Sequence, residues 1–172
     1  AYVDPSAQIV GKVSIGPGAF VGPGAVIRAD ETGPDGRVAP VVIGPESNVQ
    51  DNVIIHALGG TSVTLGARAS LSHGVIVHGP CAVGDGSFVG FRGVVFEARL
   101  GENVFVGHGA LVVGADLPAR ACVPHGGRVT TEAEAKRMGA VEASHLAFME
   151  RVVRANLSLA AGYRARRDAA GG

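Results

Sequence analysis

Three histidines lie close together in the first half of the chain, and their spacing suits metal chemistry. His56 and His78 are 22 residues apart, and His73 precedes His78 by five residues. Imidazole nitrogens are common zinc ligands, and a catalytic zinc ion takes three protein ligands and keeps one position for water. Such a metal lowers the pKa of its bound water from about 15.7 to about 7, which generates hydroxide at neutral pH.

The segments that must position these histidines repeat every six residues. Aliphatic residues recur at this period, often with glycine next, in five series: Val3, Ile9, Ile15, Val21 and Ile27; Ile43, Val49 and Ile55; Leu65, Leu71, Val77, Val83, Val89 and Val95; Leu100, Val106 and Val112; Leu117, Val123 and Val129. A helix would need apolar residues every three or four positions. The period instead predicts short strands joined by tight corners, with three sides closing one coil of about 18 residues. We therefore expect an all-β solenoid, a parallel β-helix of about seven coils.

Two insertions interrupt the period, at residues 32–40 and near residues 59–61. Insertions in a solenoid become loops that project from a corner, often beside the binding face.

The period ends after Val129, and the remaining segment is predicted to be helical. Thr131 and Glu134 form a capping-box pattern that opens a short helix, which we expect Gly139 to end. A longer helix is predicted from about residue 142 to 167, antiparallel to the solenoid, by an apolar stripe of Leu146, Met149, Val153, Leu157 and Ala160. We therefore divide one domain into a β-helix of residues 1–130 and a C-terminal helical segment of residues 131–172 packed on it.

The six-residue frame places the histidine side chains. Arg28, His56, His78 and Phe96 occupy the same position of successive coils and should form one column. His73 lies on the preceding side of its coil and points around a corner. The third ligand of a site built on His56 and His78 is then best supplied by a neighbouring solenoid, and three subunits would close such a ring. The alternative is that these histidines are structural.

The other histidines are predicted to lie outside this site. His108 and His125 fall in the column of His73 but two and three coils further along, so we assign them no catalytic role. His145 lies on the predicted long helix, and we expect it to be a surface or packing residue.

Composition restricts the function classes. The chain has 172 residues with 47% hydrophobic content, enough for one domain with a sizeable core. It has 15 basic and 15 acidic residues, so its charge favours neither a nucleic acid nor an anionic membrane as partner. Cys81 and Cys122 make no disulfide framework, and the chain has neither a signal-peptide pattern nor an apolar run of membrane-spanning length. We expect a soluble cytoplasmic protein with a small substrate.

Several segments together resemble the γ-class carbonic anhydrases. They are Arg28–Glu31 and Asn48–Asp51, followed by His56, then Ser72–Pro80, and the C-terminal run from Arg151 to Tyr163. The chain is particularly similar to the carbonic-anhydrase domain of a carboxysome protein. The resemblance implies a left-handed β-helix that forms a homotrimer. It also implies zinc, or cobalt or iron, bound by His56 and His78 of one chain and His73 of the next, for the reversible hydration of carbon dioxide to bicarbonate.

The resemblance also implies roles for neighbouring residues. Glu31 would hydrogen-bond the metal-bound solvent and assist proton movement, and Asn48 and Gln50 would orient hydroxide and bicarbonate. Arg28 and Asp51 would form an ion pair at the subunit interface, and for this pair we favour a purely structural role. The residues expected near the pocket are Asp30 and Asn156.

The chain departs from the family pattern after the first ligand. The family archetype carries a proton-shuttle glutamate in an acidic loop there, and this chain has Ala57, Leu58, Gly59 and Gly60. Either proton export uses Glu31 and buffer alone, or turnover is slow.

Two other functions remain open from the sequence. One is an acyltransferase, since hexapeptide solenoids also build enzymes that use acetyl-coenzyme A with a histidine base. The other is a catalytically weak or inactive scaffold with carboxysome or other assembly partners, which would place the protein in a carboxysome within the cytoplasm.

Overall fold

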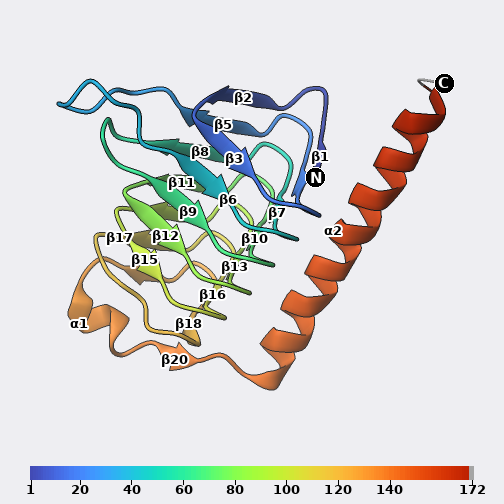
Figure 1. Cartoon of the computed structure of the whole chain (residues 1–172). Helices are drawn as coiled ribbons and strands as arrows, with labels where there is room; N and C mark the ends of the chain where they lie inside the picture. Colours follow the sequence, from blue (N-terminus) through green and yellow to red (C-terminus); the bar gives the residue numbers. More distant parts are fainter. Residues whose placement is uncertain (171–172) are drawn as a thin grey trace.

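The computed structural model describes residues 1–170, so the last two residues of the predicted 131–172 segment lie outside it. The hexapeptide period folds as predicted, into a parallel β-solenoid with three strand-bearing sides (Figure 1). The first sheet has eight strands: β1 (Tyr2–Val3), β4 (Phe20–Val21), β7 (Asn48–Val49), β10 (Ser70–Leu71), β13 (Phe88–Val89), β16 (Phe105–Val106), β18 (Ala121–Val123) and β20 (Gly139–Ala140). All its pairings are parallel except that of β18 with β20.

The other two sheets are entirely parallel. The second sheet has seven strands, which corresponds to seven coils: β2 (Gln8–Gly11), β5 (Val26–Ala29), β8 (Ile54–Ala57), β11 (Ile76–Gly79), β14 (Val94–Phe96), β17 (Leu111–Val113) and β19 (Arg128–Val129). The third sheet has five: β3 (Val13–Ile15), β6 (Val41–Ile43), β9 (Val63–Leu65), β12 (Cys81–Val83) and β15 (Arg99–Leu100).

The aliphatic residue of each hexad points into the solenoid and stacks on its equivalent in the next coil. Ile55 pairs with Val77, and Val77 with Val95, and all three are 0% exposed. Fully burying such a side chain stabilises the fold by roughly 1.5–3 kcal/mol. Side chains alternate along a strand, so the next residue of each hexad points outward. The predicted column is confirmed, because His56 pairs with His78 and His78 with Phe96.

Both insertions form loops that project from the coils. Thr32 and Val38 make an antiparallel bridge, and this loop extends beyond the coils at the upper left of Figure 1. The loop packs backbone to backbone against the second insertion. A Cβ on Gly33 would lie 2.7 Å from the Cα of Gly60, so only glycine permits this approach.

The first helix, α1 (Glu132–Ala135), begins as predicted and ends early. Thr131 is its N-cap, and the Thr131 and Glu134 side chains complete a capping box. The prediction that Gly139 ends this helix is wrong, because the C-cap is Lys136 and Gly139 belongs to β20. Pairing of Gly139 with Cys122 of β18 adds an antiparallel edge strand, and this tertiary contact overrides local helix propensity.

The long helix α2 (Ala143–Ala170) covers the first sheet, as predicted, and runs back along the coils towards β1 (Figure 1). Near its start, Met149 packs in a cluster with Phe88 and Phe105. Near its end, Ala160 packs on Tyr2 and Phe20, and the ring of Tyr163 stacks on Tyr2 with centroids 5.0 Å apart. The second and third sheets are left uncovered by α2.

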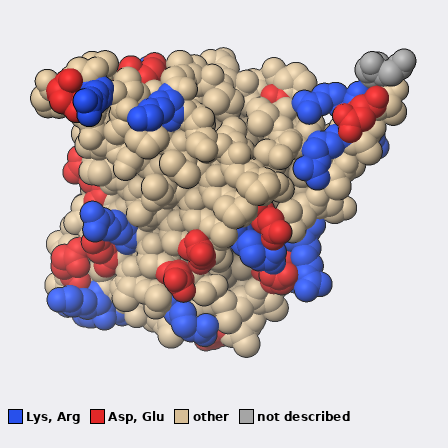
Figure 2. Space-filling view, viewed as in Figure 1, with Lys and Arg blue, Asp and Glu red and all other residues tan. Residues whose placement is uncertain are grey.

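The surface carries both charge signs. In the view of Figure 2, charged side chains gather along α2, on the insertion loop at the upper left and at the lower end, and the middle of the solenoid face is largely uncharged. Blue and red groups are interspersed on this face. None of the helices in residues 1–170 combines the length and apolarity needed to cross a membrane.

Candidate metal centre

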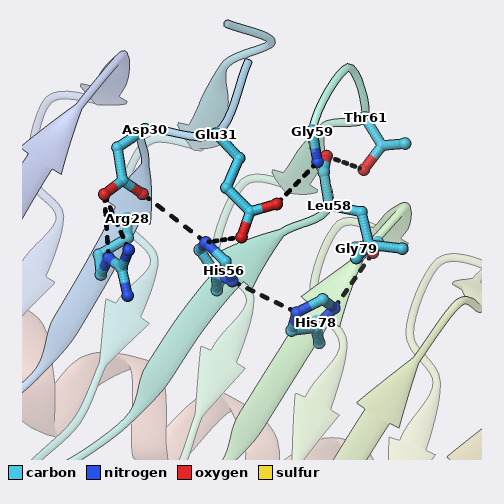
Figure 3. A network of polar contacts seen from close by, with 9 residues as sticks. All are labelled: Arg28, Asp30, Glu31, His56, Leu58, Gly59, Thr61, His78 and Gly79. Carbon is cyan, nitrogen blue, oxygen red and sulfur yellow. Dashed lines mark hydrogen bonds and ion pairs between the residues drawn. The ribbon is translucent and has the colours of Figure 1, made fainter. Parts of the chain in front are cut away.

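The two stacked histidines face each other on the uncovered second sheet. His56 Nδ1 lies 3.3 Å from His78 Nε2, and both rings are half-buried (Figure 3). Two nitrogen ligands of a tetrahedral zinc ion, each at about 2.0–2.1 Å, lie about 3.3 Å apart. The pair therefore has the separation that two ligands of one metal ion need.

His56 also carries a buried nitrogen without a partner. Its Nε2 is buried and makes no hydrogen bond, although Asp30 Oδ1 lies 3.6 Å away and Glu31 Oε1 3.5 Å away. A metal ion bound between Nδ1 of His56 and Nε2 of His78 would leave Nε2 of His56 as the ring N–H, which the two carboxylates beside it would orient. The two imidazoles with two carboxylates beside them thus fit a metal ion chemically.

Glu31 is held in place by the second insertion. Its Oε2 accepts a hydrogen bond of 3.0 Å from the Gly59 backbone N–H, and its other carboxylate oxygen faces His56 (Figure 3). A Cβ on Gly59 would collide with the carbonyl oxygen of Thr32, so the loop needs glycine there to reach Glu31. The sequence pattern indicated only a missing shuttle carboxylate, and the amide contact of Gly59 was not predicted.

Asp30 is ionised beside the pair. Arg28 donates to Asp30 Oδ2 from Nε at 3.2 Å and from Nη2 at 2.8 Å. These hydrogen bonds and the charge of Arg28 lower the pKa of Asp30. Arg28 thus pairs with Asp30 within the chain, and Asp51 lies elsewhere, with its Oδ2 3.6 Å from Nδ1 of His73.

His73 lies at the corner between the first and second sheets, as predicted. Its side chain is 54% exposed, and its ring stacks on Phe91 with centroids 5.3 Å apart. In the described residues no hydrogen bond or ion pair joins His73 to His56 or His78. Across residues 1–170 there is also no group of three or more His, Cys, Asp or Glu side chains that could hold a metal ion.

His73 lines a hollow of about 250 Å³ beside α2, and of the two residues expected near the pocket, Asn156 lines it and Asp30 does not. Gln50 and Asn156 contribute to its wall together with Phe91. Asn156 is 8% exposed and donates from Nδ2 to the carbonyl oxygen of Val152, one turn earlier in α2.

Asn48 supports Gln50 from the outer face of the first sheet, beneath α2. Gln50 donates to Asn48 Oδ1 at 2.8 Å, and Asn48 donates to the Ser70 hydroxyl at 2.7 Å. Asn48 is 0% exposed, and both ends of its amide are used in this chain of hydrogen bonds. Ser70 was missed in the sequence, although it follows Asn48 by 22 residues, the spacing that relates His56 to His78.

Comparisons with known proteins identify the class to which this fold and site belong. No protein-family model matches the chain. A carbonic anhydrase from Methanosarcina thermophila is 35% identical over 185 residues, covering 95% of this chain and 72% of that protein. The carboxysome assembly protein CcmM from Nostoc is 37% identical over 173 residues. That match covers 95% of this chain and 30% of CcmM, so the chain spans about a third of that relative's length.

The structural comparison supports the fold alone. A hexapeptide transferase family protein from Anaplasma phagocytophilum superposes with a TM-score of 0.75 at 24% identity, over 94% of this chain and 91% of that one. The identity and coverage shared with the Methanosarcina enzyme are much more specific. The chain therefore belongs to the γ-class carbonic anhydrase family, as the sequence motifs predicted.

Proposed function

We propose that this chain catalyses the metal-dependent, reversible hydration of carbon dioxide to bicarbonate, as a homotrimer with one site at each interface. The observation that carries the proposal is the His56–His78 pair, in which Nδ1 of His56 lies 3.3 Å from Nε2 of His78, with two carboxylates beside the other ring nitrogen of His56. Membership of the γ-class carbonic anhydrase family supports this activity over others.

The positions of the side chains favour a shared site. A threefold axis parallel to the solenoid keeps every coil at the same height in neighbouring subunits. His73 lies on the same coil as His78, so the corner of one subunit would meet the histidine column of the next. The outer face of the second sheet also exposes Val10, Ile54 and Ile76, at 38%, 44% and 40%, and a neighbour would bury them.

The same arrangement brings Asp51 to Arg28. Asp51 precedes His73 by one coil in the corner column, and Arg28 precedes His56 by one coil in the facing column. The predicted interface ion pair between Arg28 and Asp51 is thereby compatible with the same symmetry that brings His73 to the histidine pair. Within its own chain Asp51 would also orient His73, since its carboxylate lies beside Nδ1.

One chain would hold the metal through His56 and His78, and the next chain through His73. Zinc, or cobalt or iron in its place, supplies a Lewis acid that makes hydroxide available at neutral pH. Glu31, fixed by the Gly59 amide, accepts the proton released and passes it to buffer. Arg28 keeps Asp30 ionised beside this path.

The second chain would also position the substrate. Gln50 lines the hollow beside His73, and the buried Asn48 and Ser70 fix the orientation of its amide. An amide held in this way orients carbon dioxide and bicarbonate without reorganisation during turnover. Asn156 contributes a second amide to the same hollow.

The proposal is tested by carbon dioxide hydration measured by stopped flow on protein reconstituted anaerobically with zinc, cobalt or iron. Glu31→Gln removes the proton acceptor but keeps the side-chain size, so turnover should fall at low buffer and recover partly at high buffer. Equal turnover of both proteins at low buffer would remove Glu31 from the proton path. No turnover with any of the three metals would refute the proposed activity.

A second candidate function is that of an assembly protein with little or no turnover. It is favoured by the 37% identity to CcmM and by the Gly59–Gly60 loop in place of a shuttle carboxylate. The partners would then be carboxysome or other assembly proteins, in a carboxysome or elsewhere in the cytoplasm. Metal bound without carbon dioxide hydration, together with co-purification of such partners, would support this candidate.

A further inference from the structure

A second hollow, of about 240 Å³, lies between the start of α2 and the corner that carries His73. It is lined by Phe105, His108, His125, Ser144, His145 and Phe148. Phe148 also borders the hollow beside His73, so the two hollows are neighbours separated by this ring. None of its three histidines belongs to the proposed metal centre. His108 and His125 lie at corners of successive coils, and His145 lies in the first turn of α2.

Each of these three imidazoles accepts a backbone hydrogen bond at Nδ1. His108 accepts from the Phe91 N–H at 2.9 Å, and His125 accepts from the His108 N–H at 2.9 Å. His145 accepts from the Glu142 N–H at 3.2 Å. A ring nitrogen that accepts cannot carry a proton, so each neutral ring must carry its hydrogen on Nε2.

The same contacts exclude a hydrogen at Nδ1, because it would face the N–H group that now donates to this nitrogen. Burial and the neighbouring His125 lower the pKa of His108. The hollow is therefore bordered by three imidazoles that each present an Nε2–H donor.

These donors are not used inside the chain. Among the described residues no hydrogen bond involves Nε2 of His108, His125 or His145. Stacking occupies the ring faces, with centroids of Phe91 and His108 4.4 Å apart and those of His108 and His125 4.7 Å apart. The ring edges remain, and these carry the Nε2–H groups.

The side chains that line the hollow favour a ligand that accepts hydrogen bonds. Ser144 Oγ is the only polar side-chain atom of the lining that can accept a hydrogen bond while the imidazoles keep their Nδ1 contacts. A metal ion would need a free nitrogen lone pair, and each Nδ1 lone pair is already used by a backbone N–H. Phe105 and Phe148 provide apolar walls, and the Arg151 guanidinium lies 6.0 Å from the centre of the Phe148 ring and adds positive charge.

We propose that this hollow is a binding site for a small carboxylate-type anion, either bicarbonate or an organic carboxylate with an apolar body. The anion would accept hydrogen bonds from the Nε2–H groups, and the phenylalanine rings would contact its apolar part. The site is separate from the His56–His78 pair and does not require a metal ion. Its occupancy can therefore be measured whether or not the chain hydrates carbon dioxide.

The test is a titration of the purified full chain, labelled with ¹⁵N-histidine and free of added metal, followed by long-range ¹H–¹⁵N NMR. The free protein should show the Nε2–H tautomer at His108, His125 and His145. Sodium benzoate and sodium bicarbonate are added separately at constant ionic strength, with sodium chloride and neutral benzamide as controls. A saturable shift of these Nε2 signals with either carboxylate, absent with chloride and benzamide, supports the site. The anion that binds more tightly shows whether the site prefers bicarbonate or an organic carboxylate.

Two variants localise the effect. His145→Phe keeps a ring against Phe105 but removes one donor. If this variant folds poorly, His125→Phe keeps a ring stacked on His108 and removes another donor. Each should weaken carboxylate binding about tenfold, whereas Arg166→Ala, a remote change on the same helix, should leave it unchanged. The proposal is overturned if the Nδ1–H tautomer is found, if neither carboxylate shifts these signals, if benzamide shifts them equally, or if both histidine variants bind as the wild type does.

Discussion

A subunit-mixing experiment separates a metal site shared between chains from one held within a chain. His73→Ala removes the ligand given to the neighbour, and His78→Ala removes a ligand from the pair on the second sheet. If the proposed homotrimer forms, each variant alone should bind no metal, because every interface lacks one ligand. Neither change should unfold the solenoid, since the His73 side chain is exposed and that of His78 is half-buried.

The metal content expected of the mixture follows from the shared-site arrangement. When the two variants are mixed in equal amounts and reassembled at random, an interface is complete only if His73→Ala supplies the pair and His78→Ala supplies the corner. The probability is one half for each position, so the mixture should recover about a quarter of the wild-type metal content. A mixture of His73→Ala with wild type serves as the matched control and should hold about half.

Metal per chain is measured by inductively coupled plasma mass spectrometry after zinc reconstitution and removal of free metal. Denaturing and refolding the mixture, or expressing both variants together, allows subunits to exchange. If each chain held its own metal, the mixture of the two variants would recover none. Retention of metal by the His73→Ala homotrimer would also refute the shared site.

Three further changes test the local arguments. Gly59→Ala should displace the loop from Thr32 and remove the amide that holds Glu31. Carbon dioxide hydration at low buffer should then fall about five- to tenfold, which corresponds to the loss of a hydrogen bond of roughly 1–1.5 kcal/mol. Leu58→Ala in the same loop should change the hydration rate little, and equal effects of both variants would contradict the role given to the Gly59 amide. Backbone and side-chain hydrogen bonds from Thr130 and Thr131 lower the pKa of Glu134 below its ordinary value of 4.5. The ionised Glu134 therefore stabilises the folded chain above pH 4.5, and this stabilisation is lost as the pH falls through the lowered pKa of the folded state. Urea unfolding should therefore show Glu134→Gln to be less stable than wild type at pH 7 but nearly equal to it in strong acid, and a constant difference would argue against the capping box. Ile55→Ala removes a fully buried side chain and should lower the free energy of unfolding by about 2–5 kcal/mol, so a loss under 1 kcal/mol would contradict the packed column.

The regular part of the molecule could be predicted from the sequence because one rule repeats. The aliphatic period fixes which residues point inward, and the residue after each one must then point outward. This rule alone placed His56 over His78 and put His73 at the corner. The same counting placed His108 and His125 below His73, and the rings of Phe91, His108 and His125 do stack in that column.

The irregular parts could not be predicted because tertiary contacts decide them. The approach of Gly59 to Glu31 joins two insertions that obey no period, so counting residues cannot bring them together. Gly139 pairs with the last strand of the first sheet and does not end a helix, a choice that depends on a free strand edge formed elsewhere in the chain. The Nδ1 contacts of the histidine column depend on backbone direction at each corner, and residue spacing carries no information about it.

The central claim is that the histidine pair forms part of a metal centre that hydrates carbon dioxide. The most direct test compares wild type with His78→Ala, both purified anaerobically, for metal content per chain and for carbon dioxide hydration by stopped flow. We expect about one zinc, cobalt or iron ion per wild-type chain, with hydration, and loss of both in the variant. Wild-type protein that binds no metal, or a variant that hydrates carbon dioxide as fast as wild type, would contradict the account.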